Sequence, residues 1–131
     1  MNTRLLLTAS SLALGVVGLS LSFAPEEMFS LMSGGAIGPW AIILQLCGAL
    51  YCGFALTNWM AKGATLGGIY GRPIVIGNLM HFTIGGLALV KVVSSGSATP
   101  AWWILTGVYV VLAALFGYVM FTHPSASATN A

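Results

Sequence analysis

Four stretches of this sequence are long and almost free of charged side chains: residues 5–23, 40–61, 74–93 and 102–121. As a helix of about 20 residues, each is long enough to cross a hydrocarbon layer of roughly 30 Å. Because an irregular or extended backbone would leave peptide groups unpaired in lipid, the stretches are expected to be helical. Their continuous apolar character disfavours a β-barrel, whose strands alternate. The pattern predicts an all-α polytopic membrane protein with a four-helix transmembrane bundle.

Charge is scarce in the whole chain. Of 131 residues, 58% are apolar, and the chain has four Lys or Arg and two Glu, whereas soluble domains devote about a quarter of their residues to charged types. The net charge of +2 comes without a basic cluster, which excludes a nucleic-acid partner. Acid, base and nucleophile sets are equally scarce, so we predict no catalytic residues and no enzymatic activity. The expected partners are membrane lipids and a second copy or another membrane protein.

The distribution of charge predicts an orientation. Arg4, Lys62 and Arg72 flank one end of the predicted spans, Glu26 and Glu27 lie in the first connection, and Lys91 is the one dissenting cation. The positive-inside tendency places both termini and the 62–72 connection in the cytoplasm. Short connections favour an up-down order of antiparallel neighbours. We expect one domain over residues 1–122 and a disordered tail at 123–131.

Several side chains are predicted to anchor the bundle at the two membrane interfaces. Aromatic rings and long cations prefer the headgroup layer, and the candidates are Arg4, Lys62, Arg72, Lys91, Trp40, Trp59, Trp102 and Trp103. In the first connection, Pro25, Glu26 and Glu27 are typical of a helix start, and Gly34 is typical of a helix end. The sequence leaves open a short amphipathic helix or a flexible loop in this connection.

The first stretch has a second interpretation. Arg4 followed by an apolar run and by Ser22, Phe23 and Ala24 resembles a secretory signal with a small-residue cleavage site. Pro25 would follow the cut and is expected to hinder processing, so we favour retention of residues 1–24 as a membrane span. Cleavage would leave three spans.

Polar side chains inside the spans are the candidate site residues. Asn78 and His81 are three residues apart and share a helix face, and Gln45 lies in the preceding span. They are interpreted either as hydrogen bonds between helices or as the lining of a polar cavity. Asn58, near a span end, is expected to reach interfacial water. His81 has no second ligand at a suitable spacing, so no metal and no cofactor are predicted.

Small residues and cysteines complete the set of candidates. Close helix contacts are expected at three pairs spaced four apart, Ser11 and Gly15, Ala49 and Gly53, and Ala113 and Gly117, and at the Gly85–Gly86 notch. Cys47 and Cys52 lie about 140° apart around a helix axis and are expected to be packing residues.

The favoured hypothesis is a scaffold or small oligomer that acts through helix contacts. The alternative is a carrier or channel for a small uncharged or lipidic solute near Asn78 and His81, and a redox enzyme using the cysteines is a third hypothesis.

The order of these features resembles that of small four-helix bacterial membrane proteins, the DoxX-like and related families. The likeness rests on a short first helix, the Pro25-Glu26-Glu27 turn, the junction at 68–73, and a third helix with Asn78 and His81. It covers most of the chain and includes no highly specific motif. It implies a small bundle in the bacterial cytoplasmic (inner) membrane and assigns no catalytic residue.

Overall fold

The structure, a computed structural model, describes residues 2–63, 71–96 and 98–122. Within these ranges it contains no strand, and its helices are α1 (Thr3–Phe23), α2 (Pro25–Ser33), the short 3-10 helix η1 (Gly38–Trp40), α3 (Ala41–Ala61), α4 (Gly71–Ser94) and α5 (Pro100–Thr122). Four helical segments are long and apolar enough to cross a membrane: α1, η1 continued by α3, α4 and α5. The predicted all-helical fold with four helices of spanning length is therefore confirmed. The tail at 123–131 and most of the 62–72 connection lie outside the described residues.

The first connection forms a helix. Pro25 occupies the first turn of α2, where its missing N–H has no acceptor to lose, and Glu26 and Glu27 favour the positive end of the helix dipole. Gly34 ends the helix with a left-handed φ of 72°, a conformation that glycine adopts without strain. Of the two interpretations of this segment, the short helix is confirmed.

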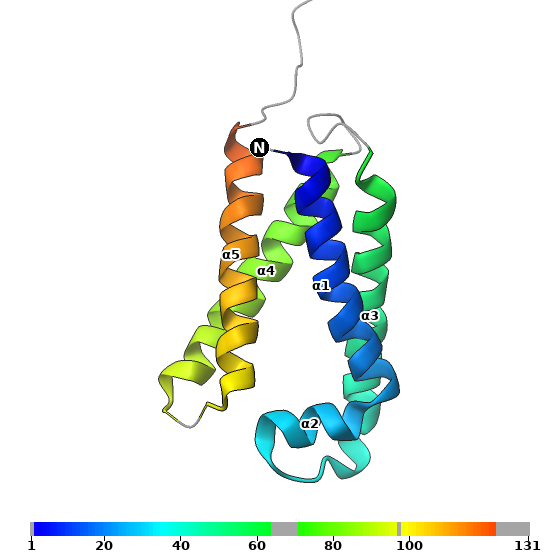
Figure 1. Ribbon diagram of the computed structural model, residues 1–131, viewed down its shortest axis with the longest axis vertical. Helices are drawn as coiled ribbons and strands as arrows, with labels where there is room; N and C mark the ends of the chain where they lie inside the picture. Colours follow the sequence, from blue (N-terminus) through cyan, green and yellow to red (C-terminus); the bar gives the residue numbers. More distant parts are fainter. Residues whose placement is uncertain (1, 64–70, 97, 123–131) are drawn as a thin grey trace, which may run out of the picture.

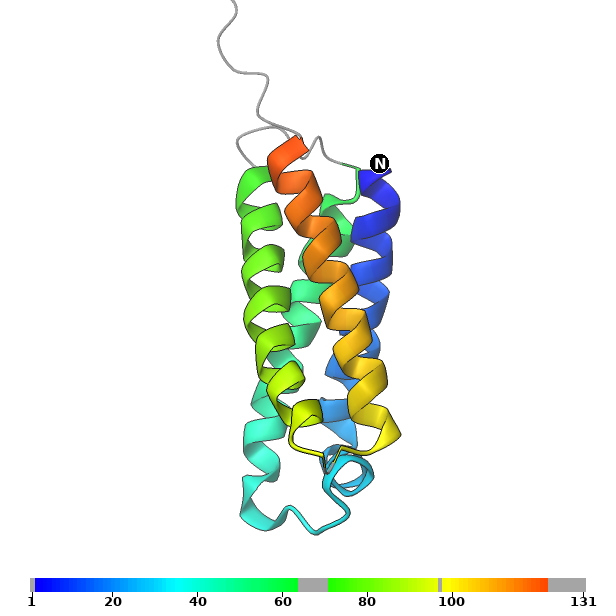
Figure 2. The same cartoon turned by 90° about the vertical axis from the view of Figure 1, so that its left-hand side faces the viewer.

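The long helices form two pairs. α1 packs along α3 and α4 packs along α5 over most of their lengths, whereas α3 and α4 contact each other at few positions. Figure 1 shows the two pairs spreading apart toward the end of the bundle that holds α2, and Figure 2 shows one pair in front of the other. The start of α1 and the end of α5 lie together at the other end.

Glycines set the spacing of the α1–α3 pair. A Cβ on Gly18 would lie 2.8 Å from the backbone N of Cys52 and 2.9 Å from the carbonyl O of Gly48. A Cβ on Gly48 would in turn lie 2.7 Å from the carbonyl O of Gly18. Because these atoms are backbone, the two helices approach this closely only without side chains at both positions.

Buried apolar side chains lie between the two pairs. The rings of Phe82 and Phe116 are fully buried and stack with centroids 5.7 Å apart, joining α4 to α5. Leu7 and Leu14 of α1 are buried in the same cluster. Most of the other large apolar side chains point outward, including Leu50, whose exposed fraction is 68%. An apolar exterior of this extent is what a protein surrounded by lipid presents.

At the spread end, α2 connects the two pairs. The indole Nε1 of Trp102, at the start of α5, donates a hydrogen bond of 2.9 Å to the carbonyl O of Met32 in α2. Met32 lies in the last turn of α2, where carbonyl groups have no partner within the helix. The bond therefore satisfies a helix end and fixes α2 against α5 at the same time.

Candidate functional site

Two polar clusters join α3 to the α4–α5 pair inside the predicted membrane layer. The first cluster consists of Ser10, Asn58 and Asn78. The amides of Asn58 and Asn78 each donate from Nδ2 to the Oδ1 of the other at 2.7 Å, and both side chains are almost completely buried. The prediction that Asn58 reaches interfacial water is therefore wrong. Its side chain lies in the bundle interior because a hydrogen-bonding partner, Asn78, lies opposite it on α4.

Every amide proton in this first cluster is used. The second Nδ2 proton of Asn58 goes to Ser10 Oγ at 3.1 Å, and the second of Asn78 goes to the carbonyl O of Ile74 at 2.8 Å. Ser10 Oγ itself donates to the carbonyl O of Leu7 at 3.1 Å. The cluster is closed, which is the arrangement expected of buried polar groups that hold helices together.

The second cluster consists of Tyr51, His81 and Tyr109, each near the middle of its helix. The hydroxyls of Tyr51 on α3 and Tyr109 on α5 are hydrogen-bonded to each other. His81 Nε2 on α4 lies 3.1 Å from the Tyr109 hydroxyl. Three helices therefore meet at one polar point, about halfway through the layer that they are predicted to cross. We refer to these residues as the Tyr–His–Tyr cluster.

Aromatic rings surround the imidazole of His81. Phe54 stacks on it with a centroid distance of 5.2 Å, and Phe82 meets it edge-on at 5.1 Å. The ring of Tyr109 reaches it because Gly85 has no side chain: a Cβ there would lie 2.5 Å from Tyr109 Cε1. The predicted notch on α4 thus serves to admit a ring of α5 and so to complete the Tyr–His–Tyr cluster.

A groove follows the line along which α3 and α4 diverge. Two adjoining hollows of about 520 and 490 Å³ share Phe54 and Gly77 as lining residues. Gly53 lines the first, with no atom within 4 Å of the position of a Cβ, and His81 lines the second. The surrounding side chains Leu50 and Met80 are exposed. We call this feature the α3–α4 groove.

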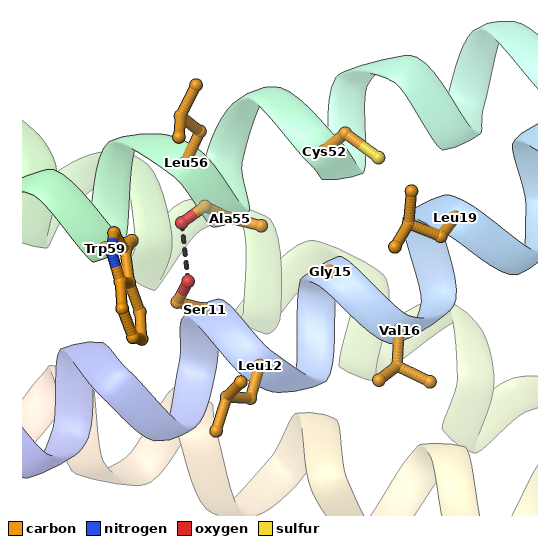
Figure 3. Close-up of a pocket in the computed structure, with 9 residues that line it drawn as sticks. All are labelled: Ser11, Leu12, Gly15, Val16, Leu19, Cys52, Ala55, Leu56 and Trp59. Atoms are coloured by element: carbon orange, nitrogen blue, oxygen red, sulfur yellow. Dashed lines mark hydrogen bonds between the residues drawn. The ribbon is translucent and has the colours of Figure 1, made fainter.

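A different groove of about 390 Å³ lies between α1 and α3 (Figure 3). Its lining is apolar except for Ser11, Cys52 and the indole N–H of Trp59, and Ser11 Oγ donates a 2.7 Å bond to the carbonyl O of Ala55. Figure 3 shows Trp59 at the Ser11 end and Leu19 near the Cys52 end. Because the Ser11 hydroxyl already donates to the backbone, most of this groove offers an occupant apolar contact.

The predicted cavity residues do not all meet. Asn78 lines the α3–α4 groove, but its amide protons are used in the closed cluster, whereas the half-buried His81 lies on the groove wall. Gln45 is exposed on α3, and its Nε2 donates a long 3.4 Å bond to the carbonyl O of Ser22 on α1. Gln45 therefore lies with the α1–α3 pair and away from His81.

The predicted interface anchors lie near helix ends. Arg4, Arg72, Lys91, Trp40 and Trp103 are exposed. Lys62 Nζ lies over the ring of Trp59, 2.9 Å from its centroid, a cation–π contact. The indole N–H of Trp102 donates to a carbonyl group of α2, so this N–H is bonded within the protein and not to the headgroup layer.

Cys47 is exposed on α3, and Cys52 is half-buried beside Gly18 of α1. Both thiols are free. Among the side chains of residues 2–63, 71–96 and 98–122, no group of three His, Cys, Asp or Glu is placed to hold a metal ion.

Besides Ser10, the sequence interpretation missed two site residues, Tyr51 and Tyr109. Both are phenols in the middle of apolar spans, where a hydroxyl needs a partner. Their depth, counted from the span ends, matches that of His81, and this common depth is the signal that could have singled them out.

The chain matches no protein-family model, no curated protein and no solved structure. The resemblance to DoxX-like membrane proteins therefore stays a prediction.

Proposed function

We propose that this chain is an integral membrane protein that binds an uncharged lipidic molecule in the α3–α4 groove, as a carrier and without converting it chemically. The observation that carries the proposal is an open groove, apolar along most of its length, whose wall includes a histidine at mid-helix. Ionisable groups inside spans are expensive and tend to mark sites of function. The helix-contact scaffold becomes the second candidate.

The groove suits an apolar chain better than a water-soluble solute. Phe54, Met80 and Ile84 supply apolar walls, and Gly77, which has no side chain, leaves the floor open. A methylene group gains about 0.8 kcal/mol on leaving water, but it gains nothing comparable on leaving lipid. An occupant from the bilayer is therefore held by shape and by polar contacts, and His81 is where such a contact is available.

The proposal includes an orientation: an up-down bundle in a bacterial cytoplasmic membrane with both termini on the cytoplasmic side. Arg4, Lys62 and Arg72 support it through the positive-inside tendency. Fusing green fluorescent protein or alkaline phosphatase to the carboxyl end tests it. Fluorescence without phosphatase activity is expected, and the reverse result would refute the orientation.

Filling the groove tests lipid binding directly. Gly53→Leu and Gly77→Leu together place two side chains in the groove, where a Cβ meets nothing closer than 3.6 Å. Gly107→Leu is the matched control, since its Cβ, like that of Gly53, meets no atom within 4 Å but Gly107 lies on α5. Native mass spectrometry of protein purified from membranes should show a retained lipid in the wild type and in the control. Equal retention in the filled variant would refute the proposal.

Self-association is favoured by one observation on the same groove. Of the predicted small-residue pairs, Ser11 and Gly15 face α3, and Gly117 faces Leu79 of α4, so these serve contacts within the chain. Ala49 and Gly53 line the groove, and Gly53 has open space beside it. A helix of a second copy can use such a surface.

Cross-linking in native membranes separates the two candidates. A dimer that is lost on Ala49→Ile and Gly53→Ile, with no lipid retained by the wild type, would favour the scaffold. A monomer that retains lipid would favour the carrier.

A further inference from the structure

The Tyr–His–Tyr cluster differs from the first cluster, Ser10, Asn58 and Asn78, in the number of polar protons for each hydrogen bond. Ser10, Asn58 and Asn78 place every side-chain proton in a hydrogen bond. The Tyr–His–Tyr cluster has two hydrogen bonds, Tyr51 to Tyr109 and Tyr109 to His81, and its members have no other hydrogen-bond partner in the described part of the chain. With a neutral imidazole, the three groups hold three protons.

One proton is therefore left over in every arrangement. If Tyr51 donates to Tyr109 and Tyr109 donates to His81 Nε2, the imidazole proton is on Nδ1, which has no partner. If Nε2 donates to Tyr109, the surplus proton is on one of the two hydroxyls and Nδ1 is a bare acceptor. A protonated imidazole would leave two donors in place of one. An unmatched donor in a medium without water is costly, and an occupant that accepts it gains what the protein lacks.

His81 is the member of the cluster that lines the α3–α4 groove, so the surplus proton is offered to the groove when it is on Nδ1. The groove has two other polar side chains near this point, Asn78 and Thr57. The amide protons of Asn78 are already used, and the Thr57 hydroxyl donates to the carbonyl O of Gly53 at 2.9 Å. His81 is thus the described lining residue through which an occupant can receive a hydrogen bond.

We infer that the molecule bound in the groove carries an uncharged hydrogen-bond acceptor, a carbonyl or ester oxygen, which receives the Nδ1 proton of His81. This inference rests on the proposed function, since it names the class of lipid that the groove takes. The acceptor is uncharged because the residues that line the two hollows include no Lys, Arg, Asp or Glu to balance a charge at this depth. Binding selects the arrangement in which both tyrosines donate toward His81.

Two probes of equal chain length, one with an acceptor and one without, distinguish the contribution of the acceptor to binding from that of the apolar chain. Methyl oleate and the alkene of the same chain length are titrated against delipidated protein in detergent micelles, and native mass spectra give the bound fraction. The ester is expected to bind on the order of 3- to 10-fold more tightly than the alkene, the range that one net hydrogen bond supplies. In ¹⁵N spectra of labelled imidazoles, the ester should shift the His81 signal and the alkene should not.

Two substitutions place the contact. His81→Phe keeps an aromatic ring on Phe54 but confines the surplus proton to the tyrosine pair, so the preference for the ester should vanish. Tyr51→Phe leaves two protons for one hydrogen bond, so a surplus remains and the preference should persist. Met80→Leu, a substitution of a neighbouring groove residue without polar atoms, is the matched control and should keep the wild-type ratio.

The outcomes separate the two proposals. If neither probe binds, the proposed function fails. If both bind with equal affinity to the wild type, or if His81→Phe keeps the preference for the ester, the groove takes apolar chains and the inference about the acceptor is wrong. Should His81→Phe prove unfolded in thermal melts, the wild-type affinity ratio and the His81 ¹⁵N signal decide alone.

Discussion

The amide groups of Asn58 and Asn78 form a reciprocal pair, each donating to the other at 2.7 Å across the line where α3 faces α4. Helix α3 belongs to one helix pair and α4 to the other, and the two helices contact each other at few positions. Among residues 2–63, 71–96 and 98–122, the amide pair is one of three polar links between the two helix pairs. The others are the Tyr–His–Tyr cluster at the middle and the Trp102 to Met32 bond at the α2 end.

Breaking the amide pair on one side should destabilise the bundle. Asn78→Leu leaves the Oδ1 of Asn58 and one of its amide protons without a partner in the interior, at an expected cost of about 1 to 3 kcal/mol in the free energy of unfolding. Thermal or SDS-induced unfolding in micelles measures it. Thr57→Val is the control, since the exposed Thr57 bonds only within its own helix.

The double variant Asn58→Leu with Asn78→Leu tests whether the loss of stability in Asn78→Leu comes from the unpaired amide of Asn58. Because two apolar side chains of similar size replace two paired amides, it should lose less than the sum of the two single losses. Strict additivity would show that the amides act independently, contrary to the geometry.

Adjacent glycines on α4 should respond differently to alanine. Gly85→Ala places a methyl group 2.5 Å from Tyr109 Cε1, which forces the ring to move and should cost about 1 to 3 kcal/mol of stability. Gly86→Ala meets Tyr109 Cβ at 3.8 Å, an ordinary contact, and gains helix propensity. Near-ultraviolet circular dichroism and thermal melts of the two variants compare them. Equal behaviour would mean that Tyr109 does not occupy the Gly85 notch.

A second glycine comparison tests the spacing of α1 and α3. Gly18→Ala is expected to push the backbones apart, since its methyl group would lie 2.8 Å from the backbone N of Cys52. Gly15→Ala, one turn earlier on the same helix, meets Ala55 Cβ at 3.7 Å and should be tolerated. Unfolding in detergent should show a loss of about 1 to 3 kcal/mol for the first variant alone. A similar loss for both would contradict the close approach at Gly18.

The hydrogen bond from Trp102 should control the mobility of α2. Trp102→Phe removes the donor to the Met32 carbonyl, a net loss of about 1 kcal/mol, and should release the last turn of α2. Hydrogen exchange of the amides in Pro25–Ser33 should then be several-fold faster. Trp103→Phe changes an exposed ring next to it and should leave exchange in α2 at the wild-type rate. Unchanged exchange in Trp102→Phe would show that other contacts hold α2.

The helices themselves could be predicted closely, because their cause is local. Apolar runs of spanning length must satisfy their own peptide groups in lipid, and the predicted stretches differ from the observed helices by only a few residues at each end. Pro25, Glu26, Glu27 and Gly34 determine α2 by the same kind of local chemistry, through a first turn and a left-handed end.

The candidate site was predictable in part. His81 was singled out because an imidazole is rare in an apolar span, and Asn78 for the same reason. The pairing of each with its partner could not be predicted, since Tyr109 lies 28 residues from His81 and Asn58 lies 20 residues from Asn78. The contact between Gly18 and Gly48 was not predicted for the same reason. Nothing in the sequence of α1 or α3 alone indicates which face of one helix packs on which face of the other.

Sequence alone determined that this chain forms long apolar helices with few ions, because hydration and backbone hydrogen bonding act on each segment separately. Tertiary structure decided that the side-chain protons of Asn78 are all used in hydrogen bonds, whereas the cluster that contains His81 has one proton more than its hydrogen bonds use and lies beside a groove. That difference depends on the angle at which α3 and α4 separate, and this angle follows from side chains packing across helices far apart in the chain.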